Sequence, residues 1–447
     1  MAQFPPELFE KIFSELSKDR RTLKACALAS RHFTNLSHQH LFRHVLIRSP
    51  QQSDVPLHKI GGSASQFEDL LKSSPHIAGY VRCLELFDWP SWYNSQNRQT
   101  ASSHWLPNDS HLHHCLPLLE KLEALVMTYR YITSRDWKEL PAPLLLALYD
   151  ILRLPSLRYL DIEGPPTLSL LHVAARNVKH LTLYNASEIS SDIENLAAHN
   201  GVVFIESLHI THYCVGTIRP NLTDLLPSNV SMRKLKKLLL DMRDTELDFS
   251  YEILERILQE LGQSLEELII LPNSSRSWSA DENSINLGTL KALKRLRVRI
   301  EYEKQPYERE INNIPWFIIF LKKSSGFLEH LETLDIAIYY EPDPSRTVVN
   351  WLVSQWNDLG EVLLNPKLLP SLKTVRMNIA CSEMQNEIWQ ATKLSNFVKT
   401  MQSSTIGFDL QYGLSNQVEF YVLNPEWCRS LYASSWLYGQ PLDEAFI

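Results

Sequence analysis

Aliphatic residues recur along this chain in short stretches spaced as Leu-X-X-Leu-X-Leu, where other aliphatic residues replace some of the leucines. The stretches are centred on Leu84, Leu125, Leu160, Leu181, Leu208, Leu238, Leu268, Leu296, Leu334 and Val375. Apolar residues at every second position predict a β-strand with one buried face. The intervening segments, most clearly Leu144 to Leu152 and Tyr251 to Leu261, have the apolar spacing of helices. One strand and one helix per unit predicts an α/β fold with a parallel sheet.

The spacing of these units is similar to that of leucine-rich repeats. The central units lie 21 to 30 residues apart, near the ~20–29 residues of such a repeat, and the outer units lie 35 to 41 apart. Each unit would bury its leucines only against its neighbours, which gives a solenoid with the sheet on its concave face. Only the unit at Leu268 carries an asparagine, Asn273, where regular repeats form an asparagine ladder. We therefore expect an irregular leucine-rich-repeat solenoid.

The first fifty residues have a different pattern, which predicts three short helices between residues 5 and 44. Two prolines begin the first helix. Its apolar stripe consists of Leu8, Phe9, Ile12, Phe13 and Leu16. Asp19 and Ser30 are placed to cap the second and third helices, and the third is expected to carry apolar residues as far as Val45. Because forty residues bury little apolar surface, the stripe favours docking on another surface, although the core of a small helical cap has the same spacing.

Four segments of this head match a known motif in order and in spacing. They are Phe4-Pro5-Pro6-Glu7-Leu8, Ile12-Phe13-Ser14-Glu15-Leu16, Leu28-Ala29-Ser30-Arg31-His32-Phe33 and Leu41-Phe42. On these segments, residues 4–47 resemble the F-box. Phe4 stands in place of the usual leucine and Phe33 in place of the usual tryptophan, and both remain apolar. With the repeats, the chain resembles the large fungal set of F-box proteins, in which a helix and a strand like Phe67 to Leu86 follow the box.

The resemblance implies a partner and a set of contacts. F-box proteins bind the Skp adaptor, and through it a cullin, in ubiquitin ligases, and their apolar residues enter a helical groove of the adaptor. By position, the adaptor-binding residues are Phe4, Pro5, Leu8, Ile12, Leu16, Leu28 and Phe33. The implied architecture is an F-box domain over 1–48, a Pro/Gly linker over 49–62, the solenoid over 63–415 and a C-terminal cap over 416–447.

Composition and charge agree with a repeat protein that acts on other proteins. Leucine supplies 71 of the 447 residues, and glycine only 13. Residues 1–50 contain eight Lys/Arg and four Asp/Glu, a net charge of +4. Because the whole chain has a net charge of −7, the remaining residues have a net charge of −11. A basic head suits an acidic partner, whereas an acidic body argues against nucleic-acid or membrane binding. Six widely spaced cysteines, and apolar runs far shorter than the ~20 residues of a membrane helix, predict a cytoplasmic or nuclear protein.

Strand alternation predicts which side chains point away from the buried leucines and toward a target protein. The candidate substrate-binding residues are Arg295, Arg297, Arg299, Ile269, Leu239, Tyr159 and Tyr184. Three arginines beside a small apolar patch favour an acidic or phosphorylated segment. The alternative is an ordinary charged strand face with local ion pairs.

The sequence offers little enzymatic chemistry. The hydrolase, dinucleotide, phosphate-loop and zinc-protease motifs are absent, and no cofactor is expected. Potential zinc ligands gather at His104, His111, His113, His114 and Cys115, but their spacing matches no standard site, so we expect a solvated loop and no metal. Acids at strand ends would suit a (β/α)-barrel enzyme; these are Asp161, Glu163, Asp241 and Asp335.

The pattern as a whole predicts a non-catalytic substrate receptor of a Skp–cullin–F-box ubiquitin ligase. The head would bind the Skp adaptor, the solenoid would hold an unknown protein substrate, and proximity would accelerate ubiquitin transfer. Two alternatives remain at this stage. The first is a repeat scaffold that promotes no degradation. The second is a barrel enzyme, which the uneven spacing of ten units fits less well.

Overall fold

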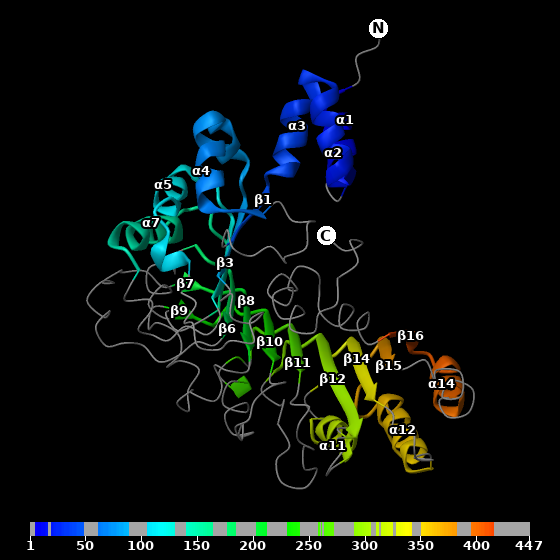
Figure 1. Cartoon of the computed structure of the whole chain (residues 1–447). Helices are drawn as coiled ribbons and strands as arrows, with labels where there is room; N and C mark the ends of the chain where they lie inside the picture. Colours follow the sequence, from blue (N-terminus) through cyan, green and yellow to red (C-terminus); the bar gives the residue numbers. More distant parts are fainter. Residues whose placement is uncertain are drawn as a thin grey trace. The chain divides into compact units, whose positions relative to one another are not determined.

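The computed structural model contains two compact units, which meet in the sequence between Val203 and Phe204 (Figure 1). The residues that it describes are 5–16, 19–48, 61–88, 105–129, 140–163, 177–184, 203–211, 230–241, 258–259, 261, 263–271, 290–304, 310–312, 314–324, 328–341, 350–381 and 395–414. Each unit contains a series of parallel strands that pair side by side.

The first unit begins with helices and continues as alternating helices and strands. Its helical elements are α1 (Pro6–Glu15), α2 (Arg20–Ala29), α3 (Arg31–Leu41), α4 (Ala64–Ser73), η2 (Pro75–Tyr80), η4 (Leu106–Asn108), α5 (Leu112–Cys115), η5 (Leu116–Leu118) and α7 (Ala142–Leu152). Its strands are β1 (His44–Arg48), β2 (Gly61–Gly62), β3 (Cys83–Asp88), β4 (Ala124–Tyr129), β5 (Tyr159–Glu163) and β6 (His180–Tyr184), and β7 (Val203–Phe204) lies at the boundary. The sheet order is β2-β1-β3-β4-β5-β6.

The leucines of the first unit stack in register across its sheet. Leu84 pairs with Leu125, Leu125 with Leu160, and Leu160 with Leu181. All four side chains are almost fully buried. Burial of one leucine stabilises a fold by about 1.5–3 kcal/mol, so each added unit extends one continuous core. The predicted helix over Leu144 to Leu152 is confirmed as α7.

The predicted start signals of the N-terminal helices are confirmed. Helix α1 begins at Pro6. The backbone N–H of Thr22 donates to Asp19 Oδ1 over 3.0 Å, and the N–H of His32 donates to Ser30 Oγ over 3.2 Å. These hydrogen bonds satisfy amides that have no partner inside the helix.

The extension of the third helix to Val45 is wrong. Helix α3 ends at Leu41, and Val45 lies in strand β1, which pairs with β3. His44 Nε2 lies 3.1 Å from Glu85 Oε2 of β3. This segment is a strand because it pairs with residues 39 positions away in the sequence. The local spacing of apolar residues cannot predict a partner at that distance.

The second unit is mainly a longer parallel sheet. Its strands are β8 (Ser207–Thr211), β9 (Val230–Ser231), β10 (Lys237–Asp241), β11 (Glu267–Leu271), β12 (Arg295–Lys304), β13 (Glu310–Asn312), β14 (Thr333–Glu341), β15 (Thr374–Cys381) and β16 (Gly407–Leu414). Its helices include α11 (Ile314–Lys323), α12 (Asn350–Leu363) and α14 (Ser395–Gln402). The main sheet order is β8-β10-β11-β12-β14-β15-β16, and β13 pairs antiparallel with β12.

The register of this second sheet follows the aliphatic repeat. The residues paired across neighbouring strands are Leu208, Leu238, Leu268, Leu296, Leu334, Val375 and Phe408. All ten predicted strands are therefore confirmed across the two units, and β1 and β16 extend the series at its ends. Of the predicted helix over Tyr251 to Leu261, only three residues are described.

The residue before six of the seven parallel strands of this sheet carries a charge, and the sign of that charge alternates from strand to strand; the residue before β16 is the uncharged Ile406. We call this row the charge ladder; it consists of Glu206, Lys236, Glu266, Lys294, Glu332 and Lys373. Lys294 Nζ lies 3.1 Å from Glu266 Oε2, and Lys373 Nζ lies 2.9 Å from Glu332 Oε1. Opposite charges side by side favour this register over a slip by one residue.

The parallel strands do not close into a ring. Among the described strands, no pairing joins β2 to β16, β2 to β6 or β8 to β16. This arrangement fits a solenoid-like α/β fold and not a closed ring of parallel strands. The predicted cap over 416–447, most of the predicted linker, and Asn273 lie outside the described residues. Within those residues, no helix has both the length and the apolar composition needed to cross a bilayer.

Candidate functional site

The three N-terminal helices have one side that forms their own core. Phe13, Leu23 and Leu41 are buried together, and the partly buried Leu16 and Phe33 pack against them. The rings of Phe13 and Phe33 lie 5.6 Å apart. Two of the five residues of the predicted stripe, Phe13 and Leu16, therefore contribute to an internal core.

Polar contacts hold the helices in this arrangement. Arg20 Nη2 donates to the carbonyl of Leu41 over 3.0 Å, which ties the start of α2 to the end of α3. Thr34 Oγ1 donates to the carbonyl of Ala27 over 2.9 Å, which joins the same two helices at their other ends. The surface that the helices present is therefore held by side-chain contacts as well as by apolar packing.

Three apolar residues of α1 and α2 lie outside this core and are exposed. The exposed fractions are 41% for Leu8, 44% for Ile12 and 90% for Leu28. Pro5 is also exposed, and Phe4 lies outside the described residues. We call Leu8, Ile12 and Leu28 the apolar docking surface. Of the seven predicted adaptor contacts, Leu16 and Phe33 are partly buried and pack against the core. The apolar stripe is wide enough to include both core residues and exposed residues.

The arginines of strand β12 form a buried ion-pair network. Arg297 Nε lies 2.9 Å from Glu267 Oε1 of β11 and 3.1 Å from Asp335 Oδ2 of β14. Arg295 Nε lies 2.9 Å from the same Asp335 oxygen, and Arg376 Nη1 of β15 lies 3.8 Å from Asp335 Oδ1. Burial lowers the pKa of the Arg297 guanidinium, and the attraction of Glu267 opposes that shift. This geometry agrees with the alternative of a strand face with local ion pairs.

The expected exposure of the neighbouring strand residues is wrong. Leu239 and Ile269 are only 0% and 1% exposed, and Arg297 is buried as well. Every described residue of β11 is buried, so both faces of this strand are covered. Alternation predicts which face a side chain is on, but not whether another part of the chain covers that face. These three residues offer no open surface to a substrate, whereas Arg295 and Arg299 are partly exposed.

The predicted aromatic surface of the first unit is described only in part. Tyr159 is 41% exposed, and its ring stacks on that of His180 with 4.2 Å between centroids. The side chain of Tyr184 lies outside the described residues, as does that of Glu163. Among the strand-end acids, Asp241 and Asp335 are buried.

The expected solvated loop is wrong, because this segment forms helix α5 with Leu112 and Cys115 buried, and two of its histidines contact a carboxylate on helix α4. His111 Nδ1 lies 2.6 Å from Glu68 Oε2, His114 Nδ1 lies 3.0 Å from Glu68 Oε1, and Lys72 Nζ lies 2.9 Å from the same oxygen. Burial raises the pKa of the Cys115 thiol to about 12, so this thiol is protonated at neutral pH. Within the described residues, no group of three or more potential ligands is arranged to hold a metal ion, and His104 is not among them.

Substitution of Glu68 by glutamine is expected to lower stability in a pH-dependent way. Hydrogen bonds from Lys72 and His111 lower the pKa of Glu68 to about 2, below the ~4.3 of an unfolded chain. The stabilisation is therefore present above about pH 4.5 and is lost as the pH falls toward 2. Urea midpoints of wild type and Glu68→Gln should differ most at pH 5–7 and converge as the pH falls toward 2. An equal difference at all pH values, or the same behaviour in Glu120→Gln on the exposed surface, would contradict this prediction.

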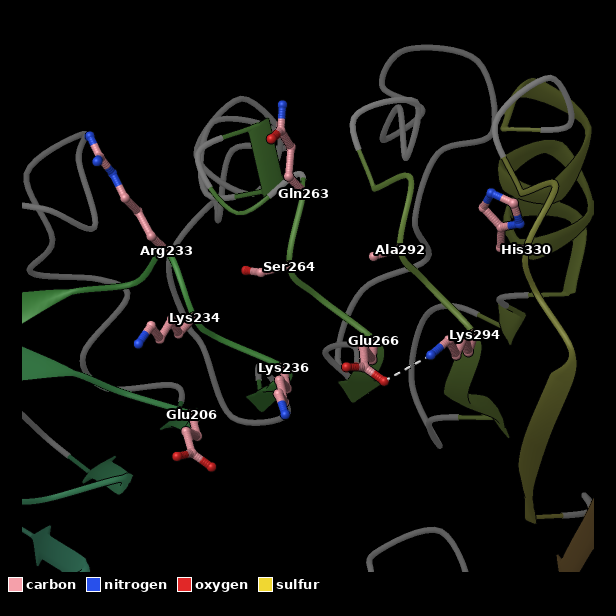
Figure 2. Close-up of a pocket in the computed structure, with 10 residues that line it drawn as sticks. All are labelled: Glu206, Arg233, Lys234, Lys236, Gln263, Ser264, Glu266, Ala292, Lys294 and His330. Atoms are coloured by element: carbon pink, nitrogen blue, oxygen red, sulfur yellow. Dashed lines mark hydrogen bonds and ion pairs between the residues drawn. The ribbon is translucent and has the colours of Figure 1, made fainter.

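A groove lies in the second unit where its strands begin (Figure 2). Its volume is about 610 Å³, and it is lined by Glu206, Arg233, Lys234, Lys236, Gln263, Ser264, Glu266, Ala292, Lys294 and His330. Four of these side chains precede the first leucine of successive repeat units at equivalent positions: Lys234, Ser264, Ala292 and His330. Because Ser264 and Ala292 are small, the surface is hollowed between the longer side chains of Lys234 and His330. Sequence reasoning missed this groove, although the row of small residues was visible in the repeat.

No protein-family model matches this chain, and no curated protein matches it. The interpretation of the sites therefore rests on their chemistry and geometry.

Proposed function

We propose that this protein is the substrate-recognition subunit of a Skp–cullin–F-box ubiquitin ligase, with an F-box at its N-terminus and an irregular leucine-rich-repeat solenoid after it. The observation that carries the proposal is the apolar docking surface. Its members, Leu8, Ile12 and Leu28, occupy F-box positions and stay exposed although their helices already have a core of their own. Isolated exposed leucines are common on surfaces, but Leu8 and Ile12 lie one turn apart on the same helix, and such an exposed apolar pair suits insertion into a groove of a partner.

The division of the N-terminal helices into two sides supports a rigid docking module. The core residues Phe13, Leu23 and Leu41 hold the helices without any help from the docking surface. A surface that is ordered before binding loses less conformational entropy when the partner binds, which favours affinity. The role assigned to the repeats is to hold a protein substrate, and no catalytic residue is needed for transfer by proximity.

The double substitution Leu8→Asp with Ile12→Asp tests the adaptor contact. Buried carboxylates without a partner oppose binding, so capture of the purified Skp adaptor by the full-length protein should fall at least about tenfold. Circular dichroism should remain unchanged, because both side chains lie outside the helical core. The matched control is Ser14→Asp with Gln39→Asp, which makes the same charge change of −2 at exposed polar positions of α1 and α3.

Unimpaired capture by the double variant, or an equal loss in the control, would refute the assigned contacts.

A second measurement separates the ligase from a non-degradative scaffold. Purification of the wild-type protein from cells should recover a cullin together with the adaptor, and recovery of the adaptor without any cullin would favour the scaffold.

A further inference from the structure

The groove of Figure 2 contains more positive than negative charge. It is lined by four cations, Arg233, Lys234, Lys236 and Lys294, and by two carboxylates, Glu206 and Glu266, which leaves +2 when His330 is neutral. Lys294 is paired with Glu266 at 3.1 Å. In the part of the chain that the structure describes, Arg233, Lys234 and Lys236 form no ion pair.

The charge ladder does not account for this excess. Lys236 and Lys294 belong to the ladder, where they alternate with glutamates, but Arg233 and Lys234 stand in the turn before it. The corresponding turn residues of the next unit are the neutral Gln263 and Ser264. The two extra cations therefore serve no sheet register, and they stand at one end of the hollow over Ser264 and Ala292.

A cation–π contact lies at the end of the groove where Arg233 and Lys234 stand. Lys234 Nζ lies 4.3 Å from the ring centroid of Phe204, which is 39% exposed. A cation over an aromatic face is held in position at little cost in solvation. An occupant of the groove would thus meet fixed positive charge beside an exposed aromatic ring.

We propose that this groove binds an acidic segment of the substrate protein, a run of aspartate and glutamate side chains. This inference rests on the proposed function, since it names the substrate class that the repeats would recognise. Three of the four cations are lysines, which act as point charges and do not form the bidentate contacts that an arginine makes with a single phosphate group, so spaced carboxylates fit this set of cations. Lys236 and Lys294 are two strand spacings apart, about 10 Å, which an extended peptide spans in about three residues. Because the chain as a whole carries a net negative charge, an acidic segment would be attracted to this groove and not to the surface around it.

A fluorescent hexaglutamate peptide tests the proposal by anisotropy with the full-length protein. Arg233→Glu with Lys234→Glu reverses the two cations outside the ladder, and the dissociation constant should rise at least about tenfold. Ala292→Phe fills the groove without changing charge and should also weaken binding several-fold. Lys322→Glu with Lys323→Glu makes the same charge change on exposed positions of α11 and should change binding by less than about twofold. Binding should weaken with added salt, because the contacts are solvent-exposed.

Three outcomes would overturn the proposal. They are an absence of hexaglutamate binding to the wild type, equal binding by wild type and Arg233→Glu/Lys234→Glu, and an equal loss in Lys322→Glu/Lys323→Glu. Adaptor capture measured on the same proteins keeps the two hypotheses apart. Groove variants should retain adaptor capture, and Leu8→Asp/Ile12→Asp should retain peptide binding. Loss of the ligase role with retained peptide binding would leave the groove as an acidic-peptide site of a different protein class.

Discussion

Replacement of Asp335 by alanine is expected to lower the free energy of unfolding by about 3–5 kcal/mol. The Asp335 side chain is almost fully buried in β14, and Arg295 and Arg297 both place Nε within 3.1 Å of its Oδ2 atom. Arg297 would keep Glu267 at 2.9 Å but lose its contact with Asp335. Loss of this carboxylate leaves buried positive charge with less compensation, and this penalty exceeds the net value of the intact pair.

The exposed pair Lys373–Glu332 is the matched control for this substitution. Its atoms lie 2.9 Å apart, close to the distances around Asp335, but both side chains are largely solvent-exposed. Lys373→Ala should therefore cost less than about 1 kcal/mol. Urea denaturation followed by circular dichroism measures both variants, and hydrogen exchange of the β12 and β14 amides localises the effect. Similar costs for the two substitutions would mean that the network is not shielded from water.

Replacement of Leu23 by alanine is expected to destabilise the N-terminal helices by about 2–5 kcal/mol, whereas replacement of Leu28 should cost less than about 0.5 kcal/mol. Both leucines lie in α2, but their exposed fractions are 0% and 90%. The first substitution leaves a cavity beside Phe13 and Leu41. The second removes a side chain that contacts little of its own protein.

Adaptor binding should respond in the opposite sense for these two leucines. Leu28→Ala should weaken adaptor capture several-fold with the fold intact, because its side chain belongs to the docking surface. Leu23→Ala should affect capture only to the extent that the helices unfold, which hydrogen exchange over residues 20–41 measures. Full adaptor capture by Leu28→Ala would remove Leu28 from the docking surface.

The two proposed sites divide the molecule into functions that separate experimentally. The docking surface is apolar and lies on α1 and α2, and the groove is cationic and lies where β10 to β12 begin. High salt should weaken hexaglutamate binding strongly and adaptor capture much less, because apolar burial is not screened by ions.

Local patterns in the chain were sufficient to place the ten strands of the repeat and the starts of the N-terminal helices. Leucines at alternate positions bury one face of each strand, and a slip by one residue would expose all of them, so Leu238 has to lie beside Leu268. Asp19 and Ser30 cap their helices through hydrogen bonds to residues two or three positions away, a distance that local sequence describes well.

Burial of the opposite strand face was decided by tertiary structure. Leu239, Ile269 and Arg297 have the alternation of outward residues, yet they are buried. Strand β1 forms because a strand distant in sequence pairs with it, and the groove exists because Ser264 and Ala292 come together from separate repeat units. Each of these features depends on what lies next to a residue in space, and periodicity within one segment contains no information about that neighbour.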